Sequence, residues 1–315
     1  MEYCYLGNTN LQVSKICFGT LSVGPVQSNL PLEKGAEVLS YGMDRGINFF
    51  DTAQLYETYS YIRRAMEISR KYDIIIASKT YAYTRQLAVD AVEQARKELN
   101  RDYIDIFLLH EQESIYTLEG HKEALEYLFE CKEKGIVKAV GASMHHVAAV
   151  HGAVKKRLDV IHPIINLNGL GIVDGTRENM EDAIKTAYQN DMGVYSMKAL
   201  GGGNLFKKAS ECLRYITELD YIHSVAIGMQ NVHEVDANIS FFENKAFTED
   251  AIKKLNSKKR KIHIDDWCTK CGTCVKRCGQ HAMYIGENTA ECDVDKCVLC
   301  GYCGTVCPEW AIKVL

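Results

Sequence analysis

The order of apolar and amphipathic segments along residues 1–246 is the feature that most restricts the fold of this chain. Short apolar runs alternate with stretches of helical period, eight of each, after a short hairpin in residues 1–14. The expected strands are 14–19, 47–51, 73–79, 103–110, 137–143, 160–166, 193–198 and 224–228. The expected helices are 31–44, 58–71, 84–99, 118–134, 145–157, 177–190, 205–219 and 232–242. Eight such units in about 240 residues predict an α/β fold, a (β/α)8 TIM barrel. The alternative is a doubly wound open sheet, which lacks support because no Gly-x-Gly-x-x-Gly turn follows the first strand.

Cysteine spacing predicts a second domain in residues 262–315. This segment holds nine of the thirteen cysteines, and eight of them form two runs of the same spacing, offset by 29 residues. That spacing is typical of a bacterial ferredoxin with two [4Fe–4S] clusters, in which the fourth cysteine of each run ligates the other cluster. The expected ligand sets are Cys268, Cys271, Cys274 and Cys307 for one cluster and Cys297, Cys300, Cys303 and Cys278 for the other.

Two other uses of the cysteines are less consistent with the sequence. A disulfide scaffold would be cysteine-dense throughout, whereas residues 1–260 carry four cysteines. Zinc sites use paired Cys-x-x-Cys units and do not require the longer repeated run. We therefore predict a small α+β ferredoxin-like domain, joined to the barrel by a helical and basic linker at residues 247–261. Cys292 is left over and is expected to pack in the small core.

Composition excludes several classes of function. A net charge of −4 argues against nucleic-acid or membrane-surface binding. No signal peptide and no apolar run long enough for a membrane span are found. Iron–sulfur clusters favour a reducing, oxygen-poor cytoplasm.

Ionisable residues follow three successive predicted strands. Asp51, Lys79 and His110 end the second, third and fourth strands, and Tyr56 lies in the loop after Asp51. Catalytic residues of such barrels sit at the carboxyl ends of strands, so these side chains are expected to meet. We expect Lys79 to lower the pKa of Tyr56 and make it a general acid and base, with Asp51 holding Lys79. His110 would orient a substrate carbonyl.

The motifs around these residues resemble the aldo-keto reductase superfamily. They are residues 46–53 (GINFFDTA) with Tyr56, then Ser78-Lys79, then residues 102–105 (DYID) leading to residues 108–110 (LLH). Residues 13–20 are also similar to the family's first strand, and the resemblance covers residues 1–245. It implies that Asp51, Tyr56, Lys79 and His110 form the catalytic tetrad. The cysteine-rich tail is similar to the iron–sulfur branch of the family.

The resemblance also implies a nicotinamide cofactor bound without a Rossmann motif. Its carboxamide would lie at Ser143 and Asn166, its ring at Met197, and its pyrophosphate at Lys198 and Gly201, after the seventh strand. Its adenine end would lie near Gly228, Gln230, Glu234 and Asn238. Gln230 stands where the family usually has an arginine for the 2′-phosphate of NADP, so NADH or a flavin (FMN or FAD) is an open alternative to NADPH.

The expected function is an oxidoreductase that reduces a carbonyl or oxidises an alcohol and exchanges electrons through two [4Fe–4S] clusters. Clusters pass single electrons whereas a hydride carries two, so a flavin or a redox partner protein is expected to link them. The alternatives are an electron-transfer subunit whose barrel is a docking scaffold, and a reductase whose clusters are purely structural. The loops at residues 22–30 and 111–117 are short, which leaves the small-molecule site open or completed by the tail.

Overall fold

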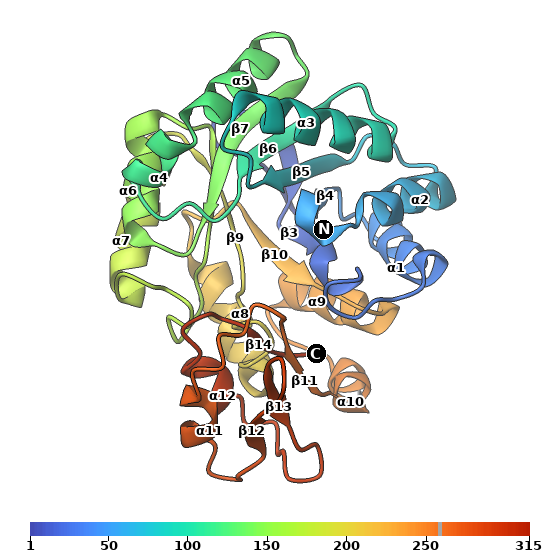
Figure 1. Ribbon diagram of the computed structural model, residues 1–315. Coiled ribbons are helices and arrows are strands. Elements are labelled where there is room, and N and C mark those ends of the chain that lie inside the picture. The colour runs from blue at the N-terminus through green and yellow to red at the C-terminus, as the bar shows by residue number, and fades with distance from the viewer. Residues whose placement is uncertain (258–259) are drawn as a thin grey trace.

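A closed barrel of parallel strands forms the body of the protein (Figure 1). The computed structural model describes residues 1–257 and 260–315, so Lys258 and Lys259 of the expected basic linker lie outside the described residues. The barrel order is β10-β3-β4-β5-β6-β7-β8-β9. The strands are β3 (Ile16–Gly19), β4 (Phe49–Asp51), β5 (Ile75–Thr80), β6 (Ile104–Leu109), β7 (Val137–Met144), β8 (Val160–Pro163), β9 (Gly193–Ser196) and β10 (Ser224–Gly228). The predicted barrel is confirmed, and the open-sheet alternative is wrong because β10 pairs with β3 and closes the sheet.

Burial on both faces explains why the strands read as continuous apolar runs. Every residue of β5 and β6 is buried. Inside the barrel, Phe49, Ile106 and Tyr195 belong to one apolar cluster, while outward residues such as Phe50 and Phe107 pack under the helices. Parallel strands covered on both sides have this composition.

The covering helices follow the prediction with two differences. They are α1 (Leu32–Asp44), α2 (Tyr59–Ser69), α3 (Arg85–Leu99), α4 (Ile115–Gly120), α5 (Lys122–Glu133), α6 (Val147–Lys156), α7 (Arg177–Gln189), α8 (Ala209–Glu218) and α9 (Val232–Asn244). The helix expected at 118–134 is instead two helices, because a capping box at Ser114 starts α4 early and the helical dihedrals break at His121. The helix expected at 205–219 begins as a 3-10 turn, η3 (Phe206–Lys208).

The predicted N-terminal hairpin closes one end of the barrel. Strands β1 (Tyr3–Tyr5) and β2 (Gln12–Ser14) pair antiparallel. Leu6, Leu11 and Val13 from this segment join the apolar cluster inside the barrel. The hairpin therefore seals the end opposite the strand ends that carry the ionisable residues.

The C-terminal segment forms a separate lobe beside the barrel (Figure 1). After α10 (Glu249–Ser257) come β11 (Ile262–Ile264), α11 (Thr273–Arg277), β12 (Met283–Ile285), β13 (Ala290–Cys292), α12 (Tyr302–Thr305) and β14 (Ile312–Val314). Strand β11 pairs with β14, and β12 pairs with β13. The repeat of 29 residues extends to the backbone: Gly272 and Gly301 precede the two short helices with φ of 76° and 78°.

The lobe is joined to the barrel through the loop after β9. A Cβ atom on Gly203, whose φ is +84°, would lie 2.0 Å from the carbonyl oxygen of Val314. The amide of Val314 donates to the carbonyl of Gly202 (3.1 Å), and the Asn204 side chain donates to the carbonyl of Ile312 (3.1 Å). Glycine at 203 is therefore required for β14 to approach this closely. Among the described residues, no helix is long and apolar enough to cross a membrane.

Candidate functional site

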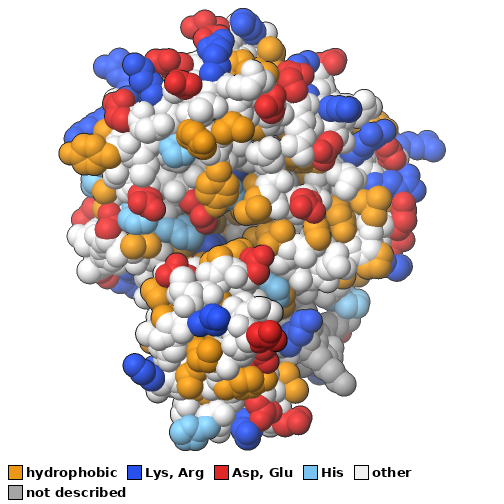
Figure 2. Space-filling model, viewed as in Figure 1, with side chains coloured by type: hydrophobic (Ala, Val, Ile, Leu, Met, Phe, Trp, Pro, Cys, Tyr) orange, Lys and Arg blue, Asp and Glu red, His pale blue; other side chains and the backbone are white. Residues whose placement is uncertain are grey.

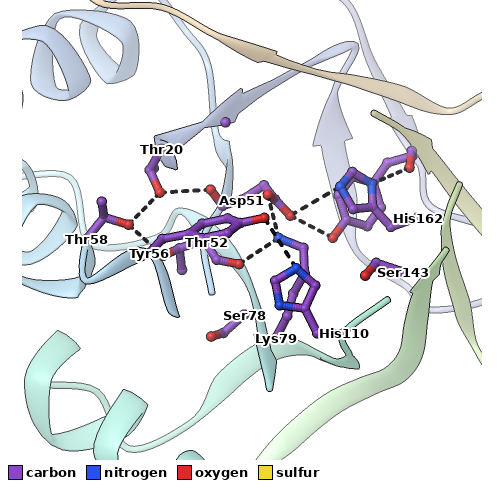
Figure 3. A network of polar contacts seen from close by, with 12 residues as sticks. Thr20, Asp51, Thr52, Tyr56, Thr58, Ser78, Lys79, His110, Ser143 and His162 are labelled. Carbon is purple, nitrogen blue, oxygen red and sulfur yellow. Dashed lines mark hydrogen bonds and ion pairs between the residues drawn. The ribbon is translucent and has the colours of Figure 1, made fainter. Parts of the chain in front are cut away.

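Three adjacent strands bring the predicted tetrad together at one end of the barrel (Figure 3). Asp51 ends β4, Lys79 lies in β5, His110 follows β6, and Tyr56 ends a 3-10 turn, η2 (Gln54–Tyr56). The Lys79 ammonium donates to Asp51 Oδ2 (2.7 Å) and to the carbonyl of Thr52 (2.8 Å). Both side chains of this ion pair are buried, which fixes the ammonium in one position.

Tyr56 lies above this ion pair and faces His110. Its hydroxyl is 3.4 Å from His110 Nε2, and its ring centroid is 4.7 Å from the Lys79 ammonium. Tyr81 stacks on the opposite side of the imidazole at 4.5 Å between ring centroids. The phenol and the imidazole therefore present two polar groups toward the same place.

Electrostatics leave Tyr56 as a phenol and His110 as a neutral imidazole. Burial, and then the negative charges of Asp51 and Glu111, raise the pKa of Tyr56 well above its usual value. The expected net lowering of this pKa is wrong, because burial and the two carboxylates outweigh the effect of the Lys79 ammonium, which is paired with Asp51. Burial, followed by Lys79, lowers the pKa of His110 well below its usual value.

Two further side chains belong to the site and were not predicted from the sequence. The Tyr195 hydroxyl donates to Asp51 Oδ1 (2.9 Å), and His162 stacks on Tyr195 at 3.9 Å between centroids. His162 Nε2 lies 3.7 Å from Asp51 Oδ1, and burial lowers the pKa of His162 to about 4. Both residues lie inside predicted strands rather than at their ends, so only their polar character within apolar runs signalled a role.

A chain of hydroxyl groups supports the backbone of Asp51. Thr20 Oγ1 donates to the Asp51 carbonyl (2.9 Å) and lies 2.7 Å from Thr58 Oγ1, which in turn lies 2.8 Å from Thr52 Oγ1. All three threonines are buried (Figure 3). These bonds tie the loop that carries Tyr56 to the first barrel strand.

The residues expected around a nicotinamide ring lie in different environments. Ser143 is buried, and its hydroxyl accepts the amide of Glu111 (2.9 Å). The Asn166 side chain bonds the backbone of Leu170 as both acceptor and donor, at 2.9 Å each, so it holds its own loop. Met197 is half-buried and bridges the ends of β8 and β9 through its backbone.

The segment expected at the pyrophosphate meets the C-terminal lobe. Lys198, with φ of +59°, has its ammonium 3.2 Å from His145 Nε2 and 5.3 Å from the Trp310 ring centroid. Gly201 accepts a hydrogen bond from the Asn204 side chain (2.9 Å), in the loop that receives β14. The glycine run at residues 201–203 therefore lies at the contact between the barrel and the lobe, which we call the seam.

The residues expected at the adenine end gather at the start of α9. Asn231 caps this helix by accepting the amide of Glu234 (3.0 Å). The Glu234 carboxylate accepts the amide of Gln230 (2.8 Å), and the Asn238 side chain donates to the Glu234 carbonyl (2.8 Å). Gly228 ends β10, and a Cβ there would lie 2.9 Å from Ser22 Cβ.

Four cysteines of the lobe line one pocket. They are Cys278, Cys297, Cys300 and Cys303, which the sequence assigns to one cluster. Amides donate to cysteine sulfur at matching positions of the repeat: Ala282 to Cys278 and Ala311 to Cys307, both at 3.3 Å.

Three further observations concern the cysteines. None of the thirteen forms a disulfide bond. Within residues 1–257 and 260–315, no group of three or more His, Cys, Asp or Glu side chains is arranged to hold a single metal ion. Cys292 packs half-buried against the small apolar core of the lobe, as expected.

A parallel eight-stranded barrel with ionisable side chains at the carboxyl ends of its strands has the architecture of a (β/α)8 enzyme. The family model described as "Aldo/keto reductase family" matches residues 15–211. The chain therefore belongs to the aldo/keto reductase family and is an oxidoreductase of that kind, consistent with dependence on NAD(P)H. The match ends before the cysteine runs.

Known proteins are similar to between 45% and 81% of the chain. An uncharacterised oxidoreductase of Bacillus subtilis (strain 168), YqkF, is 24% identical over 302 residues, covering 80% of this chain and 94% of its own. The aldo-keto reductase YhdN of the same organism is 27% identical over 45% of this chain and 47% of its own. The structure of aldo-keto reductase AKR11C1 from Bacillus halodurans (holo form) superposes with a TM-score of 0.67, at 21% identity, over 81% of this chain and 96% of that one.

Proposed function

We propose that this protein reduces a carbonyl compound at Tyr56, with Asp51, Lys79 and His110 as the other members of the catalytic tetrad. The observation that carries the proposal is the pairing of the Tyr56 hydroxyl with His110 Nε2, 3.4 Å apart, above the buried Lys79–Asp51 pair. A carbonyl oxygen set between phenol and imidazole would accept hydrogen bonds from both.

The protonation states support reduction. A nicotinamide, when bound, supplies a hydride to the carbonyl carbon. Tyr56 holds its proton because burial and Asp51 raise its pKa, so it can donate that proton to the oxygen as charge develops. Lys79 lies 4.7 Å from the ring centroid and stabilises the phenolate that remains. Asp51, itself held by the Tyr195 hydroxyl, keeps the Lys79 side chain in place.

The cofactor residues remain part of the proposal. Met197 and Lys198 are partly exposed and stay the strongest candidates for contact with a nicotinamide and its phosphates. Ser143 and Asn166 would shape the cofactor site indirectly, through the loops that their side chains hold in place. At the adenine end, the start of α9 would contribute through Gln230, Glu234 and Asn238. Gly201 and Gly228 would contribute backbone only. Gln230 favours NADH or a flavin over NADPH, since an amide is neutral.

We further propose that the lobe binds two [4Fe–4S] clusters. One would use Cys278, Cys297, Cys300 and Cys303, whose side chains line a common pocket. The other would use Cys268, Cys271, Cys274 and Cys307. The hydrogen bonds from backbone amides to the sulfur atoms of Cys278 and Cys307 are of the kind that stabilise the thiolate ligands of a cluster. A cubane's four ligands bind four different irons, so they stand further apart than the ligands of a single ion. The clusters would carry single electrons to or from the barrel.

An electron-transfer subunit without carbonyl turnover is the second candidate function. Large apolar side chains that line the cysteine pocket support it, because Val298 and Tyr302 are 53% and 54% exposed. Such a surface suits a redox partner protein. In this case the barrel would be a scaffold for docking.

Spectroscopy and turnover of the full-length, anaerobically purified protein test both proposals. We expect reduction of aldehydes with NADH or NADPH, and broad iron–sulfur absorption that bleaches with dithionite. Flavin bands after reconstitution would identify the link between one-electron and two-electron chemistry. Electron transfer to viologens without reduction of any carbonyl would favour the second candidate function instead.

A further inference from the structure

Lys198 is a cation without a counter-ion at the barrel mouth. It follows β9, and its recorded hydrogen-bond partner is His145 Nε2 at 3.2 Å. No ion pair is recorded for it among the described residues, whereas Lys79 and Lys313 each pair with a buried aspartate. Burial, followed by the charge of Lys313, lowers the pKa of Lys198 to about 7, and no paired carboxylate from the described part of the chain offsets this effect. An anionic ligand would supply the missing negative charge.

Trp310 supplies a second unpartnered donor at the same place. It comes from the C-terminal lobe, and its ring centroid lies 5.3 Å from the Lys198 ammonium. Trp310 is 8% exposed, and none of the described residues accepts a hydrogen bond from its Nε1. An indole N–H is a donor only, so it needs an acceptor that this chain does not provide.

His145 adds a third donor. The ammonium of Lys198 has no lone pair and must donate to His145 Nε2, which leaves the imidazole proton on Nδ1. Burial, followed by the charge of Lys198, lowers the pKa of His145 well below its usual value and keeps it neutral. These three residues thus combine one positive charge with neutral N–H donors.

This group lies close to the tetrad. His110 follows β6, and His145 follows the neighbouring strand β7, while Lys198 follows β9 at the same end of the barrel. Figure 2 shows the surface hollowed between the barrel and the lobe, with histidine and basic side chains along the hollow. A ligand at Tyr56 can therefore reach Lys198.

We propose that Lys198, His145 and Trp310 form an oxyanion subsite that takes the carboxylate of the carbonyl substrate reduced at Tyr56. This inference rests on the proposed function and specifies its substrate class, an aldehyde or ketone that carries a carboxylate. The C-terminal lobe then completes the substrate site through Trp310. The same subsite chemistry would accept a cofactor phosphate, so the test must separate the two sources.

A pair of rigid aldehydes that differ only in charge tests the proposal. We expect wild-type protein to reduce 3-formylbenzoate with a kcat/KM roughly tenfold to a hundredfold above that for 3-formylbenzamide, the range of a charge-assisted hydrogen bond. Lys198→Met should abolish this preference by lowering kcat/KM for the carboxylate far more than kcat/KM for the amide. Lys198→Arg should keep most of it, and Lys208→Met, an exposed change in the same loop, should leave it intact. Trp310→Phe should reduce the preference by a smaller factor.

Three results would overturn the proposal. One is an unchanged preference in Lys198→Met, and another is an equal loss for both aldehydes. A third is a rise of the KM for the nicotinamide with the preference unchanged, which would assign the anion to the cofactor. If wild-type protein reduces neither aldehyde, the proposed function has failed. Calorimetry with isophthalate then decides the subsite: binding lost in Lys198→Met supports it, and equal binding refutes it.

Discussion

Replacing Asp51 by asparagine should destabilise the protein and stop carbonyl reduction together. The Asp51 carboxylate accepts the Lys79 ammonium at 2.7 Å and the Tyr195 hydroxyl at 2.9 Å, and the Lys79 side chain is fully buried. An amide keeps the shape but leaves Lys79 as an uncompensated buried charge. Breaking a buried ion pair in this way costs about 3–5 kcal/mol. The midpoint of thermal unfolding should fall by roughly 6 °C or more.

Asp159→Asn is the control. Asp159 accepts the Lys132 ammonium at 2.6 Å, but the Lys132 side chain is 39% exposed and stays hydrated when its partner is lost. We expect a smaller destabilisation of about 1 kcal/mol and retained carbonyl reduction. Calorimetry and an aldehyde assay under anaerobic conditions measure both variants. An Asp51→Asn midpoint as high as that of Asp159→Asn would refute the account of the buried pair.

Three other predictions concern the seam, the clusters and pH. Gly203→Ala should loosen the lobe and make the linker more susceptible to proteolysis, because the new Cβ would meet the backbone of β14. Gly135 also has a positive φ (+72°) but has open space around it, so Gly135→Ala should leave proteolysis unchanged. Cys307→Ser should halve the iron content from roughly eight per chain, whereas Cys292→Ser should leave it unchanged. Burial lowers the pKa of His162 from 6.5 to about 4, so the folded protein binds fewer protons than the unfolded chain below pH 6.5. Thermal stability should therefore be full above pH 6.5 and fall toward pH 4, with a shallower fall in His162→Gln; an equal slope in both proteins would contradict the assignment.

The barrel could be predicted because its strands are buried on both faces and its helices show one apolar side. The break at His121 could not, since residues 118–134 keep a helical period throughout and the break follows from the capping of α4 at Ser114. Local cap geometry competes with periodicity and leaves little trace in the hydrophobic pattern.

The tetrad could be located because the end of a buried strand can be recognised in the sequence, where a polar residue follows an apolar run. His162 and Tyr195 could not, because their contacts with Asp51 depend on the register and inward direction of two other strands. The direction of the Tyr56 pKa shift could not be predicted from the sequence either, since it depends on the burial of the phenol and on the carboxylates of Asp51 and Glu111 near it.

The glycine run after β9 has a further role that only the fold reveals. Its sequence predicts a phosphate site, and that interpretation does not include contact with a strand about a hundred residues later. Val314 lies against Gly202 and Gly203, so the fold gives these glycines a role in joining the two parts of the chain. Contacts at such sequence separation follow from tertiary packing alone.

The rate of Tyr56→Phe tests the central proposal most directly. Full-length protein, purified anaerobically, is assayed for aldehyde reduction and for electron transfer to a viologen, with the exposed Tyr116→Phe as control. Loss of the proton donor should lower kcat for the aldehyde by roughly a hundredfold or more while viologen reduction is unchanged. Aldehyde reduction by Tyr56→Phe at the wild-type rate would contradict the assignment of this barrel site as the place of carbonyl chemistry.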